Sequence, residues 1–206
     1  MEIRKLPFMP TPREAADLIA SLNSKTATFT TLVRETGERP GEAWNTEWID
    51  IDFENKTINI TPEKGSNPRK LPLGDKLLLM LNSLSRNGPK VFQGSYRHFV
   101  RGFRRQRKRI AFKLKNDRIN KISFKTLRTL KASEEIAKHR TLKEVQYILG
   151  HKSIVSTDFY VQLVNFGSDD YTCESADTVE KAQKLIEAGF EYVCEIENIK
   201  LFRKHK

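Results

Sequence analysis

The chain has few of the residues and segments that mark secreted, zinc-binding or membrane proteins. It holds only two cysteines, Cys173 and Cys194, and their spacing fits neither a zinc site nor a disulfide framework. No apolar run approaches the roughly 18 to 20 residues that a membrane span requires, and the opening "MEIRKLPFMPTPRE" lacks the apolar stretch of a signal peptide. We therefore expect a cytoplasmic protein with no metal site and no contact with a membrane.

Acidic residues are also in the minority. The 206 residues include 37 lysines and arginines against 26 acids, a formal net charge of +11, which favours a polyanionic partner over an anionic membrane surface. The charge is uneven, because residues 168–206 hold nine acids against six bases, so that the remainder carries about +14. We expect two domains, a larger basic one over residues 1–166 and a small one over residues 167–206.

The spacing of apolar residues predicts a mostly helical α+β protein. Three short alternating runs in residues 48–74, separated by turn formers, predict a small three-stranded antiparallel sheet. Helical spacing, with capping boxes at Thr11 and Thr141 and a terminating Gly37, predicts helices before and after that sheet. These helices are expected over residues 11–23, 28–35, 75–86, 95–115, 123–138, 141–150 and 154–163. The tail predicts a small βαββ unit.

One expected helix, "YRHFVRGFRRQRKRIAFKLK", is basic on one face. Its apolar face would comprise Phe99, Phe103, Ile110 and Leu114. Its basic face would comprise Arg97, Arg101, Arg104, Arg105 and Lys108. Residues 97–131 hold 14 basic residues against one acid, and so one-sided a segment would repel itself unless an anion accompanies it. We predict phosphate contacts through Arg97, Arg101 and Arg105; a solvated helix face is the alternative.

Six polar residues elsewhere have the chemistry to act on a phosphate: Arg39, Lys64, Lys125, Arg128, His151 and Tyr160. Each one taken alone also fits a structural role. Arg39 could form an ion pair with Glu42, the two lysines could be solvated, His151 could cap a helix, and Tyr160 could be a core ring. The individual residues therefore leave both interpretations open.

The order and spacing of these residues resemble the catalytic domain of the tyrosine recombinases, the family of the phage lambda integrase. The first arginine of that family follows a "TG-x-R-x-x-E" box, matched here by "TGERPGE" with Arg39 and Glu42. A hairpin lysine in "KG…R.VPL" is matched by "KGSNPRKLPL" with Lys64 and Arg69. The "LGH" histidine, His151, follows the second arginine by 23 residues, and the tyrosine follows that histidine by nine. The resemblance covers residues 10–163.

The resemblance implies a role for each site residue. Arg39 and Arg128 would bind the oxygens of a pentavalent phosphorane, while Tyr160 attacks a DNA phosphodiester and forms a 3′-phosphotyrosyl linkage. Lys64 would be the general acid, and His151 would hydrogen-bond the phosphate or assist proton transfer. Because the linkage stores the bond energy, religation would need no ATP, metal or other cofactor. Lys125 stands where the family usually has a histidine, so its part in proton handling is open.

The implied protein is a site-specific DNA recombinase, an integrase of an archaeal virus or plasmid in a prokaryotic host. Its partners would be double-stranded DNA attachment sites and three further copies of the chain in a tetramer on DNA. An N-terminal DNA-clamping domain is not found in these 206 residues, so we expect a catalytic fragment or a shortened relative. The alternatives are a type IB topoisomerase-like or resolvase enzyme, and a non-catalytic DNA-binding module in which Tyr160 is structural.

Overall fold

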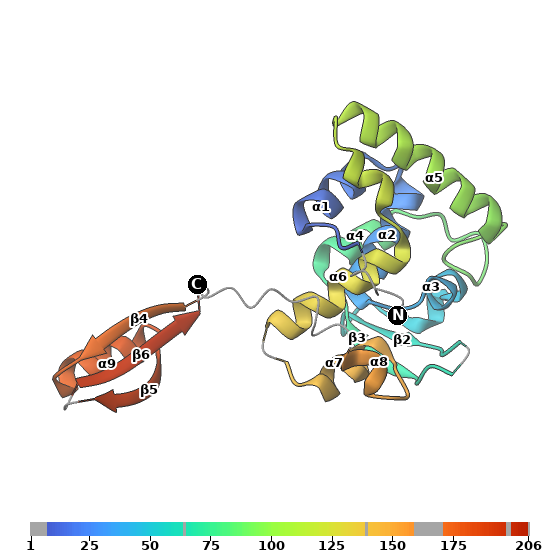
Figure 1. Cartoon of the computed structure of the whole chain (residues 1–206). Coiled ribbons are helices and arrows are strands. Elements are labelled where there is room, and N and C mark those ends of the chain that lie inside the picture. Colours follow the sequence, from blue (N-terminus) through green and yellow to red (C-terminus); the bar gives the residue numbers. More distant parts are fainter. Residues whose placement is uncertain (1–7, 64, 139, 159–170, 197–198, 206) are drawn as a thin grey trace, which may run out of the picture. The chain divides into compact units, whose positions relative to one another are not determined.

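The computed structural model describes residues 8–63, 65–138, 140–158, 171–196 and 199–205. The chain forms two compact units, Met1–Val164 and Asn165–Lys206 (Figure 1). No helix in the described parts of the chain combines the length and the apolar character that crossing a membrane requires.

The first unit is mostly helical. Its helices are α1 (Pro12–Ser21), α2 (Ser24–Thr36), α3 (Pro40–Asn45), α4 (Asp75–Asn82), α5 (Tyr96–Lys113), α6 (Phe124–Ala137), α7 (Leu142–Leu149) and α8 (Val155–Asp158), with short 3₁₀ turns at Trp48–Asp50 and Asp117–Lys121. The capping boxes at Thr11 and Thr141 both form, and Gly37 ends α2 in the left-handed conformation.

Helix α2 begins earlier than its sequence suggests, at Ser24 rather than near residue 28. Asn23 caps it by accepting a hydrogen bond from the backbone N–H of Thr26. The threonines that lower its helix propensity are accommodated because the hydroxyls of Thr28 and Thr30 donate to carbonyls four residues back. Both threonines are buried, so tertiary packing outweighs the weak local preference.

Three short strands form the predicted antiparallel sheet. They are β1 (Ile51–Asp52), β2 (Thr57–Ile60) and β3 (Arg69–Pro72), in the order β1-β2-β3. Figure 1 labels the neighbouring strands β2 and β3. Ile58 pairs with Leu71, and both side chains are buried. The segment that joins β2 to β3 carries Lys64, which lies outside the described residues.

An aromatic cluster holds the helices together and fixes the basic helix α5 on the core. Phe29 of α2 makes edge-to-face contacts with Trp44 of α3, Phe99 of α5 and Phe124 of α6, with ring centroids 4.8 to 5.9 Å apart. The predicted apolar face of α5 is wrong at Leu114, which is 41% exposed. The helix ends at Lys113, so Leu114 is its C-cap and leaves the helical stripe.

The second unit contains β4 (Tyr171–Ala176), α9 (Val179–Glu187), β5 (Glu191–Ile196) and β6 (Ile199–His205). The predicted order of strand, helix, strand and strand is present. The last strand lies in the middle of the sheet, in the order β4-β6-β5, and is antiparallel to both neighbours. Thr178 caps α9 through the backbone N–H of Lys181, and Phe202 of β6 is buried.

Candidate active site

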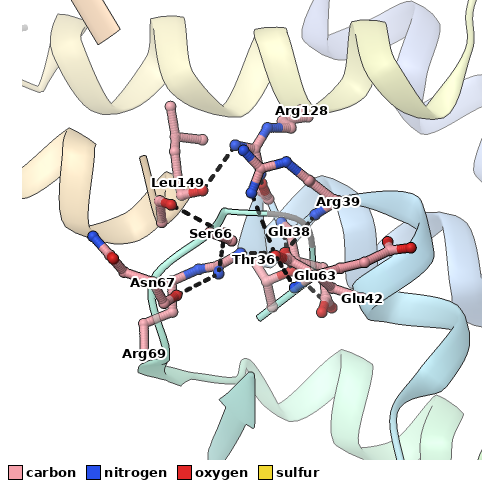
Figure 2. A network of polar contacts seen from close by, with 12 residues as sticks. Thr36, Glu38, Arg39, Glu42, Glu63, Ser66, Asn67, Arg69, Arg128 and Leu149 are labelled. Carbon is pink, nitrogen blue, oxygen red and sulfur yellow. Dashed lines mark hydrogen bonds and ion pairs between the residues drawn. The ribbon is translucent and has the colours of Figure 1, made fainter. Parts of the chain in front are cut away.

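Arg128 of α6 lies at the centre of a buried polar network (Figure 2). Its guanidinium donates to two backbone carbonyls, those of Gly37 at the end of α2 and of Leu149 at the end of α7. The same Nη2 atom that lies 2.8 Å from the Leu149 oxygen is also 2.8 Å from Nε2 of His151. The second arginine and the "LGH" histidine of the sequence motif are therefore in direct contact.

His151 is held as a neutral imidazole with a defined tautomer. A guanidinium can only donate, so Nε2 must accept from Arg128. The other nitrogen, Nδ1, then carries the proton and donates to the hydroxyl of Thr157, 3.0 Å away. Burial and, after it, the nearby guanidiniums of Arg128, Arg39 and Arg69 together lower the pKa of the imidazole to about 4.

Arg39 precedes α3, in the turn that follows α2. Glu42 reaches back as expected: its carboxylate accepts the backbone N–H of Arg39 at 2.9 Å and lies 3.4 Å from Nη1 of the guanidinium. The side chain of Arg39 remains 32% exposed, whereas Arg128 is buried. Arg39 is therefore the more accessible of the two guanidiniums to an incoming phosphate.

Glu42 has a second partner that sequence reasoning missed. Its Oε2 accepts from Nη2 of Arg69 at 2.7 Å, and neither side chain is exposed to solvent. Hydrogen bonds from Arg69 and from the Arg39 backbone hold the pKa of Glu42 at about 2, against the opposing effect of burial. The sequence contains a signal for this pair, because Arg69 and Leu71 are alternate residues of β3 and therefore share its buried face.

Hydrogen bonds join residues just before and at the start of β3 to the end of α7. Gly150 accepts hydrogen bonds from the backbone N–H of Asn67 and the hydroxyl of Ser66, both at 3.0 Å, and Nε of Arg69 donates to the carbonyl of Ile148 at 2.8 Å. Gly150 has a φ of +65°, and a Cβ there would lie 2.4 Å from Nη1 of Arg69. Only glycine fits, and this packing positions His151 beside Arg128.

Among the residues that the structure describes, the other expected site residues lie outside this network. Lys64 and Tyr160 lie outside the described residues. Lys125 is exposed on α6, one turn before Arg128. Arg97, Arg101 and Arg105 are exposed on α5. Within the described ranges, no cluster of three or more His, Cys, Asp or Glu side chains could hold a metal ion.

Sequence reasoning also missed Glu38, the residue between Gly37 and Arg39. Its side chain is completely buried, and burial raises its pKa to about 8, although Arg69 and Arg128 oppose that shift. The network therefore carries a net positive charge. It combines three guanidiniums, one firmly ionised carboxylate and a neutral imidazole, which suits the stabilisation of a doubly charged oxyanion.

Comparison with known proteins identifies the family of this chain. The profile of the phage integrase family matches residues 10–165, so the chain belongs to that family. A tyrosine recombinase of Thermosipho africanus (strain TCF52B) is 27% identical over 173 residues, which cover 79% of this chain and 59% of that protein.

Two solved structures share the fold. The XerA recombinase superposes with a TM-score of 0.66 at 18% identity, covering 91% of this chain and 66% of that one. The XerH site-specific recombinase bound to its difH substrate superposes with a TM-score of 0.61 at 20% identity, covering 76% and 50%. The chain spans only part of the proteins that it matches, about 59% of the length of the Thermosipho relative.

Proposed function

We propose that this protein is a site-specific DNA recombinase, an integrase that cleaves and rejoins DNA strands through a tyrosine. The observation that carries the proposal is the convergence of Arg39, Arg128 and His151, which are up to 112 positions apart in the sequence, into one buried polar network. Their spacing relative to Tyr160 matches the tyrosine recombinases, and membership of the phage integrase family supports the same chemistry.

In the proposed reaction the Tyr160 phenol oxygen attacks the scissile phosphorus, and the bond to the 5′ oxygen of the next nucleotide breaks. The phenol loses its proton to solvent water, and the departing 5′ oxygen takes one from Lys64, which we assign as the general acid. Arg39 and Arg128 neutralise the negative charge that builds up on the phosphorane. His151, held as a neutral imidazole, adds no positive charge; its Nε2 accepts from Arg128 and so orients that guanidinium for the phosphate.

The proposed partner is double-stranded DNA. Exposed arginines on α5, namely Arg97, Arg101 and Arg105, would contact its phosphates and position the enzyme without reading bases. Assembly of a homo-tetramer on DNA belongs to the same proposal, as does an origin in a mobile genetic element. The archaeal origin and the position of the domain boundary near residue 166 remain predictions.

A suicide-substrate assay tests the central claim. Nicked duplexes tiled across the DNA that flanks this coding sequence would be incubated with the protein, and a complex that resists denaturant would be measured by gel electrophoresis. We expect the parent protein to form the complex. Tyr160→Phe should bind the same duplex in a gel-shift experiment and form no covalent complex, because it lacks the attacking oxygen.

The outcomes separate the alternatives. A Tyr160→Phe protein that still forms the covalent complex would refute the nucleophile assignment. DNA binding without any covalent complex from the parent would favour a non-catalytic module. Relaxation of supercoiled DNA without exchange between two labelled duplexes would identify a type IB topoisomerase-like activity instead.

A further inference from the structure

Glu38 is a fully buried acid close to Arg39 in the chain and to Arg128 in space. Neither the proposed chemistry nor the sequence motif gives it a role. It lies directly before Arg39 in the chain, and directly after Gly37, whose carbonyl accepts from Arg128. Three charged side chains face it from three elements: Arg69 from β3, Glu42 from α3 and Arg128 from α6. A change in its charge would therefore act directly on Arg128, and Arg39, the other guanidinium proposed to bind the phosphate, is its neighbour in the chain.

Hydrogen-bond counting shows which protonation state the site accommodates. The hydroxyl of Thr36 contacts the carbonyl of Leu32 at 2.7 Å and Oε1 of Glu38 at 3.1 Å, and the backbone N–H of Glu38 points at the same hydroxyl from 3.3 Å. A hydroxyl has one proton and two lone pairs. If Thr36 donates to Leu32, the shorter contact, then the bond to Oε1 forms only when Glu38 carries the proton and donates it.

The second oxygen of Glu38 agrees with a neutral group. Oε2 is buried and has no hydrogen-bond partner among the described residues. A buried carboxylate without partners on one oxygen is strongly disfavoured, whereas the carbonyl oxygen of a neutral acid tolerates this environment better. Burial also outweighs the attraction of both arginines, since the pKa of Glu38 is about 8 rather than 4.5.

We propose that Glu38 is a positioning residue that works as a neutral acid, and that its ionisation weakens the phosphate-binding charge of Arg39 and Arg128 and slows DNA cleavage. This inference rests on the proposed recombinase function. With Glu38 neutral, three guanidiniums and the Glu42 carboxylate leave two net positive charges. The phosphorane formed from a phosphodiester and a phenolate carries two negative charges. Ionised Glu38 would lower the net charge of these described groups from +2 to +1.

The test compares the pH profiles of Glu38→Gln and the parent. Glutamine has nearly the same shape, can donate to Thr36 as the protonated acid does, and does not ionise. Single-turnover formation of the covalent complex would be measured from about pH 6 to pH 9.5 on the duplex that the parent cleaves. We expect similar rates near pH 6, and a rate ratio of variant to parent that grows roughly tenfold or more across about pH 7 to 9.

Glu38 and Glu47 line one pocket, whose other acidic residues are Glu42, Asp50 and Glu63. Glu47→Gln is therefore the matched control, because it removes a charge from the same pocket at a residue that does not contact Thr36. It should keep the parent's pH profile. A variant-to-parent ratio for Glu38→Gln that stays constant with pH overturns the inference, since tyrosine and lysine titrations affect both proteins equally. The same growing ratio in Glu47→Gln also overturns it, because the effect would then belong to general surface charge.

A direct titration makes the inference testable even if Glu38→Gln fails to fold or the parent forms no adduct. The side-chain carboxyl carbon of Glu38 would be followed by NMR in the ¹³C-labelled parent protein. A midpoint above about pH 7 is expected, and a midpoint below it overturns the inference. A parent that forms no adduct on any duplex refutes the proposed function, while this titration still reports on Glu38.

Discussion

Replacement of Glu42 by glutamine should make the first unit much easier to unfold. The change leaves the shape of the side chain nearly intact but removes the charge that faces the buried guanidinium of Arg69 at 2.7 Å. Breaking a buried ion pair by removing one partner costs about 3 to 5 kcal/mol, because the remaining charge is uncompensated. The pKa of Glu42 gives a similar magnitude: a shift from 4.5 to about 2 corresponds to roughly 3 kcal/mol.

Urea denaturation followed by tryptophan fluorescence measures this loss. Both tryptophans, Trp44 and Trp48, lie within six residues of Glu42, and Trp44 is buried. If the unfolding free energy falls by about 2 kcal/mol per molar urea, a loss of this size lowers the urea midpoint by roughly 1.5 to 2.5 M. Glu144→Gln is the matched control, because Glu144 is exposed in the capping box of α7; it should cost about 1 kcal/mol or less.

The pH dependence identifies the group responsible. Folding lowers the pKa of Glu42, so its stabilising contribution is complete above about pH 4.5 and is lost as the pH falls toward 2. The difference in unfolding free energy between the parent and Glu42→Gln should therefore be largest near neutral pH and narrow over that acidic window. The second substitution Arg69→Met, made in the Glu42→Gln background, should recover part of the stability. A loss below about 1 kcal/mol at pH 7, or a difference that does not narrow in acid, would refute the reasoning.

Three further predictions concern DNA cleavage and binding. Arg39→Ala and Arg128→Ala should each lower the single-turnover cleavage rate by roughly 10² to 10³, as loss of an oxyanion donor does; rates within about tenfold of the parent for both would mean that the arginines only bind. Lys125→His should keep substantial activity because histidine is the commoner residue of the related enzymes, and complete loss with an unchanged circular dichroism spectrum would assign proton handling to the lysine. Replacement of Arg97, Arg101 and Arg105 by glutamine should reduce the log-log salt slope of duplex binding by about two to three, and an unchanged slope would place the DNA contact elsewhere.

Local signals predicted the elements that carry the site. The capping boxes at Thr11 and Thr141 and the glycine that ends α2 depend only on residues a few positions apart. Both capping boxes form, and the glycine ends the helix, as expected. The period-two runs of residues 48–74 predicted the antiparallel sheet for the same reason, because alternation depends on neighbouring side chains. The pairing of Arg39 with Glu42 also follows from a spacing of three residues at a helix start.

Other features depended on residues that are distant in the chain. Helix α2 extends over buried threonines because the surrounding core stabilises it, and Leu114 leaves the apolar stripe of α5 because the helix stops one residue earlier.

The sequence by itself determined the local elements, the basic character of α5 and the spacing of the motif residues. The charge states of the buried acids and of the histidine were decided only by the tertiary structure. Glu42 and Glu38 are four residues apart, yet Glu42 meets Arg69 and is ionised, whereas Glu38 is buried against Thr36 and has a raised pKa. His151 is neutral because folding buries its ring and brings Arg128 against it. Desolvation and Coulomb interactions depend on what surrounds a group in space, and that environment is assembled from segments far apart in the chain.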